Sequence, residues 1–72
     1  MMENIFIKTP FIKLDAFLKF AGEAGTGGEA KVYILEEKVL VNGEVCTMRG
    51  KKLFSGDVVK ISGKEFSVAQ GE

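Results

Sequence analysis

The stretch Thr26–Gly43, TGGEAKVYILEEKVLVNG, decides the fold because it changes from a helical pattern to a hairpin pattern. Its first residue, Thr26, stands three residues before Glu29, which is the spacing of a capping box at the start of a helix. Apolar residues then repeat at helical spacing. From Val39 they alternate instead, up to the pair Asn42-Gly43, which is typical of a type I′ turn with positive φ at both residues. The stretch therefore predicts a helix followed by a two-stranded hairpin.

A shorter helix and a first strand are predicted before this stretch. The apolar residues of the helix lie at positions i, i+3, i+4 and i+7, and they are Leu14, Phe17, Leu18 and Ala21. Gly22 is a natural end for this helix. The segment Asn4–Lys8 is rich in β-branched and aromatic residues, so it predicts a strand, which Pro10 ends and which places Phe6 in the core.

A second hairpin is predicted near the end of the chain. Four apolar residues alternate on either side of Ser62-Gly63 and are expected to face the core, namely Val59, Ile61, Phe66 and Val68. Between the two hairpins, the segment Cys46–Lys52 is irregular and basic, and Ser55-Gly56-Asp57 has the residues of a turn.

The order of these elements gives the fold class. A strand, two helices and a run of antiparallel strands predict an α+β fold, in which two short helices pack on a small twisted antiparallel sheet. We expect the second helix to be pressed between the first helix and this sheet, because Val32 and Leu35 widen its apolar surface. A chain of 72 residues forms one such domain, over residues 1–72.

The composition argues against an enzyme. The chain has no histidine and one cysteine, so it lacks the commonest general base, the commonest zinc ligand and any internal disulfide. Asp15 is explained by its place in the first turn of a helix, where an acidic side chain is stabilising, and Asp57 by local backbone contacts in a turn. Cys46 is explained as a small apolar filler. We therefore expect no catalytic residue, no metal site and no cofactor.

The sequence also gives an expectation for the cellular compartment. The first residues, Met1–Asn4, lack the charged and apolar segments of a signal peptide. The longest strongly apolar run, Val32–Leu35, is much shorter than a membrane span. We expect a cytoplasmic monomer that makes no membrane contact.

Charge is distributed unevenly along the chain, although ten basic and ten acidic residues cancel. Residues 21–37 contain four glutamates and one lysine, whereas residues 48–64 contain five cations and one aspartate. A basic surface suits an anionic partner such as RNA, and an acidic helix suits a protein partner.

Read in order, these motifs resemble the small RNA-binding domain named after ribosomal small-subunit protein four, including its αL motif. The first helix contributes Lys13-Leu14-Asp15 with Phe17 and Leu18 to the resemblance. The αL motif is matched by Thr26, Ala30, Ile34, Val39, Val41, Asn42 and Gly43, and then by Leu53, Gly56, Asp57, Val58 and Ile61. The resemblance spans Phe11 to Val68, so residues 11–68 are expected to be the core of the motif.

The resemblance implies that the protein binds structured RNA. Members of this family bind ribosomal or transfer RNA, which implies a role in ribosome assembly or translation, where a ribosomal particle could provide further contacts. The run Arg49–Leu53 resembles the short, stand-alone bacterial members. Two positions depart from the family: Gly27 stands where it often has arginine, and Glu37 stands where it often has glycine.

Eight residues are candidates for RNA contact: Lys13, Thr26, Gly27, Gly28, Lys31, Arg49, Lys51 and Lys52. The last three place cations close together on a loop, which suits phosphate contact but also describes a solvated surface. The glycine-rich turn lets amides approach a phosphate at a helix start, or it is simply a capped turn. Lys31 either replaces the missing arginine or lies in solvent.

Two further features leave the function open. Phe20 and Phe54 fall off the periodic positions, so we expect them to be partly exposed, either as surfaces for stacking a base or packed under a loop. A protein-interaction adaptor that uses the acidic helix face is the alternative function.

Overall fold

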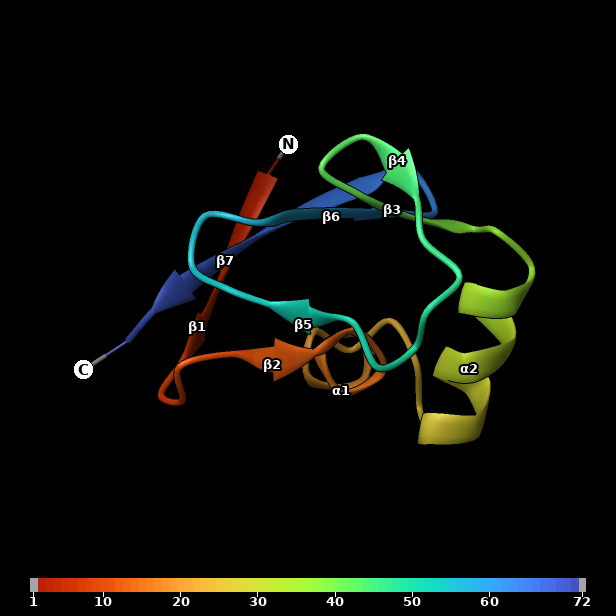
Figure 1. Ribbon diagram of the computed structural model, residues 1–72, viewed down its shortest axis with the longest axis horizontal. Helices are drawn as coiled ribbons and strands as arrows, with labels where there is room; N and C mark the ends of the chain where they lie inside the picture. The colour runs from red at the N-terminus through yellow and green to blue at the C-terminus, as the bar shows by residue number, and fades with distance from the viewer. Residues whose placement is uncertain (1, 72) are drawn as a thin grey trace.

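Seven strands and two helices make up the computed structural model, which describes residues 2–71 (Figure 1). In chain order they are β1 (Met2–Ile7), β2 (Ile12–Lys13), α1 (Leu14–Phe20), α2 (Gly27–Leu35), β3 (Val39–Val41), β4 (Glu44–Val45), β5 (Lys52–Leu53), β6 (Val58–Ile61) and β7 (Lys64–Gln70). The larger sheet has the strand order β1-β7-β6-β3-β4, and β2 pairs with β5 in a separate small sheet. The α+β fold with two helices is therefore confirmed.

The larger sheet is mixed, which corrects the expectation of an antiparallel sheet. Strands β3, β4, β6 and β7 pair in antiparallel fashion, and hairpins join β3 to β4 and β6 to β7. Strand β1 instead runs parallel to β7, with Ile5 opposite Val68. Because almost the whole chain connects these two strands, no hairpin constrains their relative direction.

The Asn42-Gly43 turn adopts the type I′ conformation that the sequence predicts, and the turn of the second hairpin adopts the same conformation. Asn42 and Gly43 have φ angles of 52° and 87°, and Ser62 and Gly63 have φ angles of 53° and 77°. Positive φ at both central residues is the signature of a type I′ turn, which matches the twist of the flanking strands.

The core lies between the larger sheet and α1. The predicted inward residues of the second hairpin are buried, together with the predicted apolar face of α1: Val59, Ile61, Phe66, Val68, Leu14, Phe17 and Leu18. The rings of Phe17 and Phe66 meet edge to face, with centroids 6.3 Å apart and an angle of 79° between the planes. The expectation that Phe6 is a core residue is wrong, because Ile5 and Ile7 point inward and the alternation of a strand leaves Phe6 60% exposed.

Helix α2 lies at one end of the molecule and packs on α1 (Figure 1). Its buried residues are Ala30 and Ile34, which face the core. Val32 and Leu35 are 49% and 57% exposed. The expectation that α2 is pressed between α1 and a sheet is therefore wrong, since only one side of the helix has a neighbour.

Both helices end in a Schellman motif, which needs a left-handed residue just after the helix. After α1 this residue is Gly22, with φ 82°, and the Glu23 amide donates to the Leu18 carbonyl at 3.0 Å. After α2 it is Glu37, with φ 60°, and the Lys38 amide donates to the Tyr33 carbonyl at 3.1 Å. A non-glycine residue is strained in this conformation. This strain explains why the family often has glycine at the position that Glu37 occupies in this chain.

Replacing Glu37 with glycine is expected to stabilise the protein by about 1 kcal/mol, because it removes the steric cost of a left-handed side chain. Urea denaturation followed by circular dichroism measures the change. Gly22→Ala is the matched control at the equivalent position of α1, and it should lower stability by a similar amount. A Glu37→Gly variant that unfolds at lower urea than the wild type would contradict this account.

Candidate nucleic-acid interface

The small sheet of β2 and β5 brings two distant lysines together. In its antiparallel register Ile12 lies opposite Leu53 and Lys13 lies opposite Lys52. Like charges directly opposite each other on a sheet are destabilising, so an anionic partner would relieve this pair. This pairing could not be predicted from the sequence, because strands of two residues carry no periodicity.

The basic segment Cys46–Lys52, which we call the basic loop, is held at the start of α1 by backbone hydrogen bonds. The Leu14 amide donates to the Lys51 carbonyl at 2.9 Å, and the Asp15 amide donates to the Arg49 carbonyl at 3.1 Å. Lys13, the N-cap residue, makes no side-chain cap, so these carbonyls satisfy helix amides that would otherwise lack partners. The side chains of Arg49 and Lys51 are consequently displayed at the helix start.

Four exposed cations, Lys13, Arg49, Lys51 and Lys52, form what we call the basic cluster. Among residues 2–71 none of the four forms an ion pair. By contrast, Lys38 pairs with Glu36 at 3.2 Å and Lys64 pairs with Glu23 at 3.3 Å. The positive charge of the basic cluster is thus left for an external anion.

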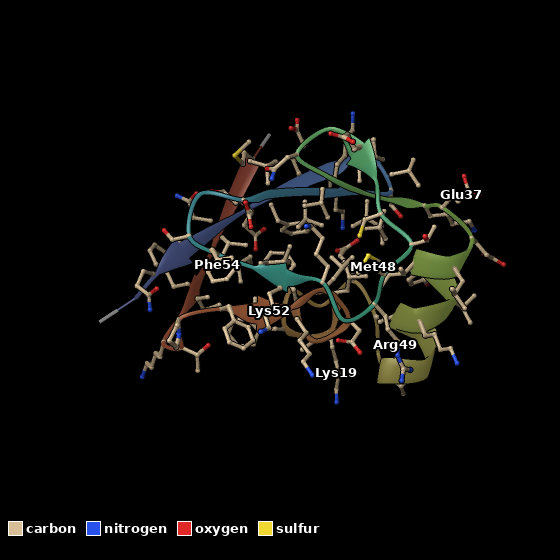
Figure 2. The ribbon with its side chains drawn as sticks, in the orientation of Figure 1. Lys19, Glu37, Met48, Arg49, Lys52 and Phe54 are labelled. Atoms are coloured by element: carbon tan, nitrogen blue, oxygen red, sulfur yellow. The ribbon has the colours of Figure 1, made fainter. Side chains whose placement is uncertain are left out.

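Lys19 joins this side of the molecule and was missed by the sequence analysis. Figure 2 shows its side chain on the same side as those of Arg49 and Lys52, next to α1. Lys19 is exposed in the last turn of α1. Its exposure could have been predicted from the sequence, because Lys19 lies outside the apolar stripe of α1.

The glycine-rich turn is a separate site at the start of α2. Thr26 caps the helix, its hydroxyl oxygen accepting from the Glu29 amide at 3.1 Å. The Glu29 carboxylate accepts from the Gly25 amide at 3.3 Å, one residue before the Thr26 amide that a capping box engages, so only the Thr26 half of the box forms as its spacing predicts. This carboxylate would repel an anion at the helix start. A simple capped turn therefore explains the local contacts.

The remaining candidates of this turn are exposed. A Cβ at Gly27 would meet nothing within 4 Å, and one at Gly28 would meet only the Thr26 hydroxyl at 3.9 Å. The fold therefore does not require glycine at either position. Lys31 is also exposed, on α2. The structure thus divides the eight candidates into the basic cluster and a second group on α2, made up of Thr26, Gly27, Gly28 and Lys31.

The polar residues of the αL motif have a structural role. The Asn42 amide group donates to the Asp57 carboxylate at 3.1 Å, and its oxygen accepts from the Val58 amide at 2.9 Å. The other oxygen of Asp57 accepts from the Phe54 amide at 2.8 Å. These bonds tie the turn of the first hairpin to the turn after β5, and they confirm the local backbone contact expected for Asp57.

Two exposed rings match the sequence analysis, since Phe20 and Phe54 are 63% and 50% exposed. Cys46 is partly buried against the core, as expected of a small apolar filler. In the part of the chain that the structure describes, no three histidine, cysteine or acidic residues group as metal ligands would. None of the helices within residues 2–71 has the length and hydropathy needed to cross a membrane.

The comparison with protein families decides the identity of this domain. The pattern described as "S4 domain" matches residues 5–69, which is nearly the whole chain. The chain belongs to the S4 domain family. This confirms the resemblance that the sequence motifs carried, and with it the assignment as an RNA-binding domain.

Two bacterial relatives of this S4 domain support the assignment. The chain is 48% identical over 63 residues to the "Probable ribosome maturation protein RlbA" of Bacillus subtilis, covering 88% of this chain and 89% of that protein. It is 34% identical over 61 residues to the "Putative RNA-binding protein YbcJ" of Escherichia coli, covering 85% of this chain and 87% of that protein.

The solved structure of YbcJ from Escherichia coli has the same fold. The two structures superpose with a TM-score of 0.67 at 31% identity, covering 94% of this chain and 85% of the YbcJ chain. That solution structure is described as revealing an αL motif involved in RNA binding. The αL motif expected from the sequence is confirmed.

Proposed function

We propose that this S4 domain binds structured ribosomal or transfer RNA through its phosphates, and that it acts in the maturation of the ribosome in the cytoplasm. The observation that carries the proposal is the basic cluster, whose loop is fixed to α1 by two backbone hydrogen bonds. The similarity to the "Probable ribosome maturation protein RlbA" of Bacillus subtilis supports the ribosomal role. The RNA-binding unit is the single domain, with residues 11–68 as its core.

The geometry favours phosphate contact over base readout. Arg49 can bind a phosphate with two parallel hydrogen bonds, whereas the lysines act as point charges. Backbone contacts hold Arg49 and Lys51 in place, so little loop ordering opposes binding. The second group, on α2, would add a backbone contact if an RNA phosphate displaced the Glu29 carboxylate from the turn.

RNA binding is expected to be modest in affinity and strongly dependent on salt concentration. With about four phosphate contacts, affinity should fall roughly fiftyfold or more when salt rises from about 50 to 200 mM, because each contact releases counterions. Filter binding or fluorescence anisotropy with bulk transfer RNA and ribosomal RNA measures this slope. An affinity that does not change with salt would exclude phosphate contact as the driving interaction.

The ribosomal role is tested by sedimentation of cell extracts. Tagged protein is expected to migrate with immature ribosomal subunits at low salt and to return to the top of the gradient at high salt. Deleting the protein is expected to increase the fraction of immature subunits. If the protein stays at the top of the gradient at low salt while its purified form binds transfer RNA, its role lies elsewhere in translation.

One observation favours a second function as a protein-interaction adaptor. Val32 and Leu35 are exposed on α2, and the acidic residues Glu36 and Glu37 follow directly. An adaptor would bind its partner equally well after the charges of the basic cluster are removed. Affinity capture from extract with that variant distinguishes the two functions.

A further inference from the structure

Phe54 is an exposed ring on a fixed piece of backbone. It follows β5, where Leu53 is fully buried, yet Phe54 itself is 50% exposed. Its amide donates to the Asp57 carboxylate at 2.8 Å, and its carbonyl accepts from the Asp57 amide at 3.0 Å. The backbone is therefore anchored on both sides of the ring, while half of the side chain lies in solvent.

A second ring and a cation support Phe54. The Phe11 ring is tilted by 49° to the Phe54 ring, with centroids 6.0 Å apart. The Lys52 ammonium lies 4.9 Å from the centroid of Phe11, in a cation–π contact. In Figure 2, Lys52 and Phe54 leave the chain at β5 and directly after it. Phe11, Lys52 and Phe54 together form what we call the aromatic step.

The aromatic step is continuous with the basic cluster, since Lys52 belongs to both. Lys52 also lies opposite Lys13 across the small sheet. Phe54 is linked to Lys52 through the Phe11 ring, which contacts both. Two other exposed rings, Phe6 and Phe20, line a hollow of about 350 Å³ with Lys8, and within residues 2–71 they have no such link to the basic cluster. Phe54 is therefore the exposed ring that is linked to the positive charge expected to bind RNA.

A nucleotide fits this combination of groups. It carries a flat base, which can stack on an aromatic ring, and an anionic phosphate, which can bind an ammonium group. The bases inside an RNA duplex are already stacked, so only an unpaired base could cover Phe54.

We propose that Phe54 stacks against an unpaired base of the bound RNA while Lys52 and Lys13 hold the adjoining phosphates. This inference rests on the proposed function and names its substrate class more closely. The preferred RNA is a stem interrupted by a bulged or loop nucleotide, because a uniform duplex can satisfy the basic cluster but leaves the ring uncovered.

The test compares two RNA duplexes that differ by one nucleotide. One is fully paired, and the other carries a single bulged 2-aminopurine, whose fluorescence falls when it stacks. Wild-type protein is expected to bind the bulged duplex roughly 5- to 100-fold more tightly, the range of a single base–aromatic stack, and to quench its fluorescence. Phe54→Leu should lose both the preference and the quenching while binding the paired duplex as before, and Phe54→Tyr should keep both.

The outcomes separate this inference from the proposed function. If the wild type binds both duplexes equally without quenching, stacking on Phe54 is excluded and phosphate binding stands. If Phe54→Leu, with an unchanged thermal midpoint, keeps the preference and the quenching, the base stacks elsewhere and the assignment to Phe54 fails. If neither duplex nor bulk ribosomal RNA binds at low salt, the proposed function itself fails.

Discussion

Replacing Phe17 with alanine is expected to remove most of the stability of the domain. Phe17 is fully buried between α1 and the larger sheet, where its ring meets Phe66 edge to face. Truncating a buried phenylalanine to alanine costs about 3–5 kcal/mol, because it loses transfer free energy and leaves a cavity. A domain of 72 residues has a total stability of about 4–10 kcal/mol. Its one cysteine leaves the domain without an internal disulfide to offset the loss.

Urea denaturation followed by circular dichroism measures this effect. Phe20→Ala is the matched control, since Phe20 lies on the same helix and is 63% exposed. Its free energy of unfolding should stay within about 0.5 kcal/mol of the wild type. Equal losses for the two variants would show that Phe17 does not lie in the core as described.

Neutralising the loop cations is expected to have the second large effect. The triple variant Arg49→Gln/Lys51→Gln/Lys52→Gln should bind ribosomal RNA roughly a hundredfold more weakly at about 0.1 M salt, because three counterion-releasing contacts are lost. The fold should survive, because the loop contacts α1 through the carbonyls of Arg49 and Lys51 and not through their side chains. Losing the contact of Lys52 with Phe11 costs only about 0.5–1 kcal/mol at such an exposed site.

A second triple variant separates a local effect from an effect of net charge. Lys38→Gln/Lys60→Gln/Lys64→Gln changes the net charge by the same amount, away from the basic cluster. The pair of Lys38 with Glu36 is exposed, so its loss changes stability little. The Glu23 partner of Lys64 is only 14% exposed at its side chain, so the thermal midpoint of this control is measured before its RNA affinity. RNA affinity should fall by only a few-fold in this control. If both triple variants lose affinity equally, RNA responds to net charge and the basic cluster is not a specific surface.

Local features of the fold could be predicted from the sequence because each depends on neighbouring residues. The capped start of α2 follows from Thr26 and Glu29, which lie three positions apart. The first hairpin follows from Asn42 and Gly43, which tolerate positive φ. The buried face of α1 follows from the helical spacing of its apolar residues.

The long-range strand pairings could not be predicted from the sequence, for a physical reason. The parallel pairing of β1 with β7 joins segments at opposite ends of the chain, and no turn motif specifies it. The two-residue strands β2 and β5 have no periodicity of their own, yet their pairing places Lys13 opposite Lys52. The clustering of Arg49, Lys51 and Lys52 could therefore be predicted because they are neighbours in the sequence, and only the fold shows that Lys13 joins them.

The central claim is that the basic cluster binds RNA, and a titration of isotope-labelled protein tests it most directly. Backbone amide signals are followed while bulk bacterial ribosomal RNA is added at low and then moderate salt. The account predicts shifts or broadening at residue 13 and residues 49–52, weakened by salt and absent in the Arg49→Gln/Lys51→Gln/Lys52→Gln variant. Unchanged amides at these positions, with shifts confined to α2 in cell extract, would contradict the account and favour the protein adaptor.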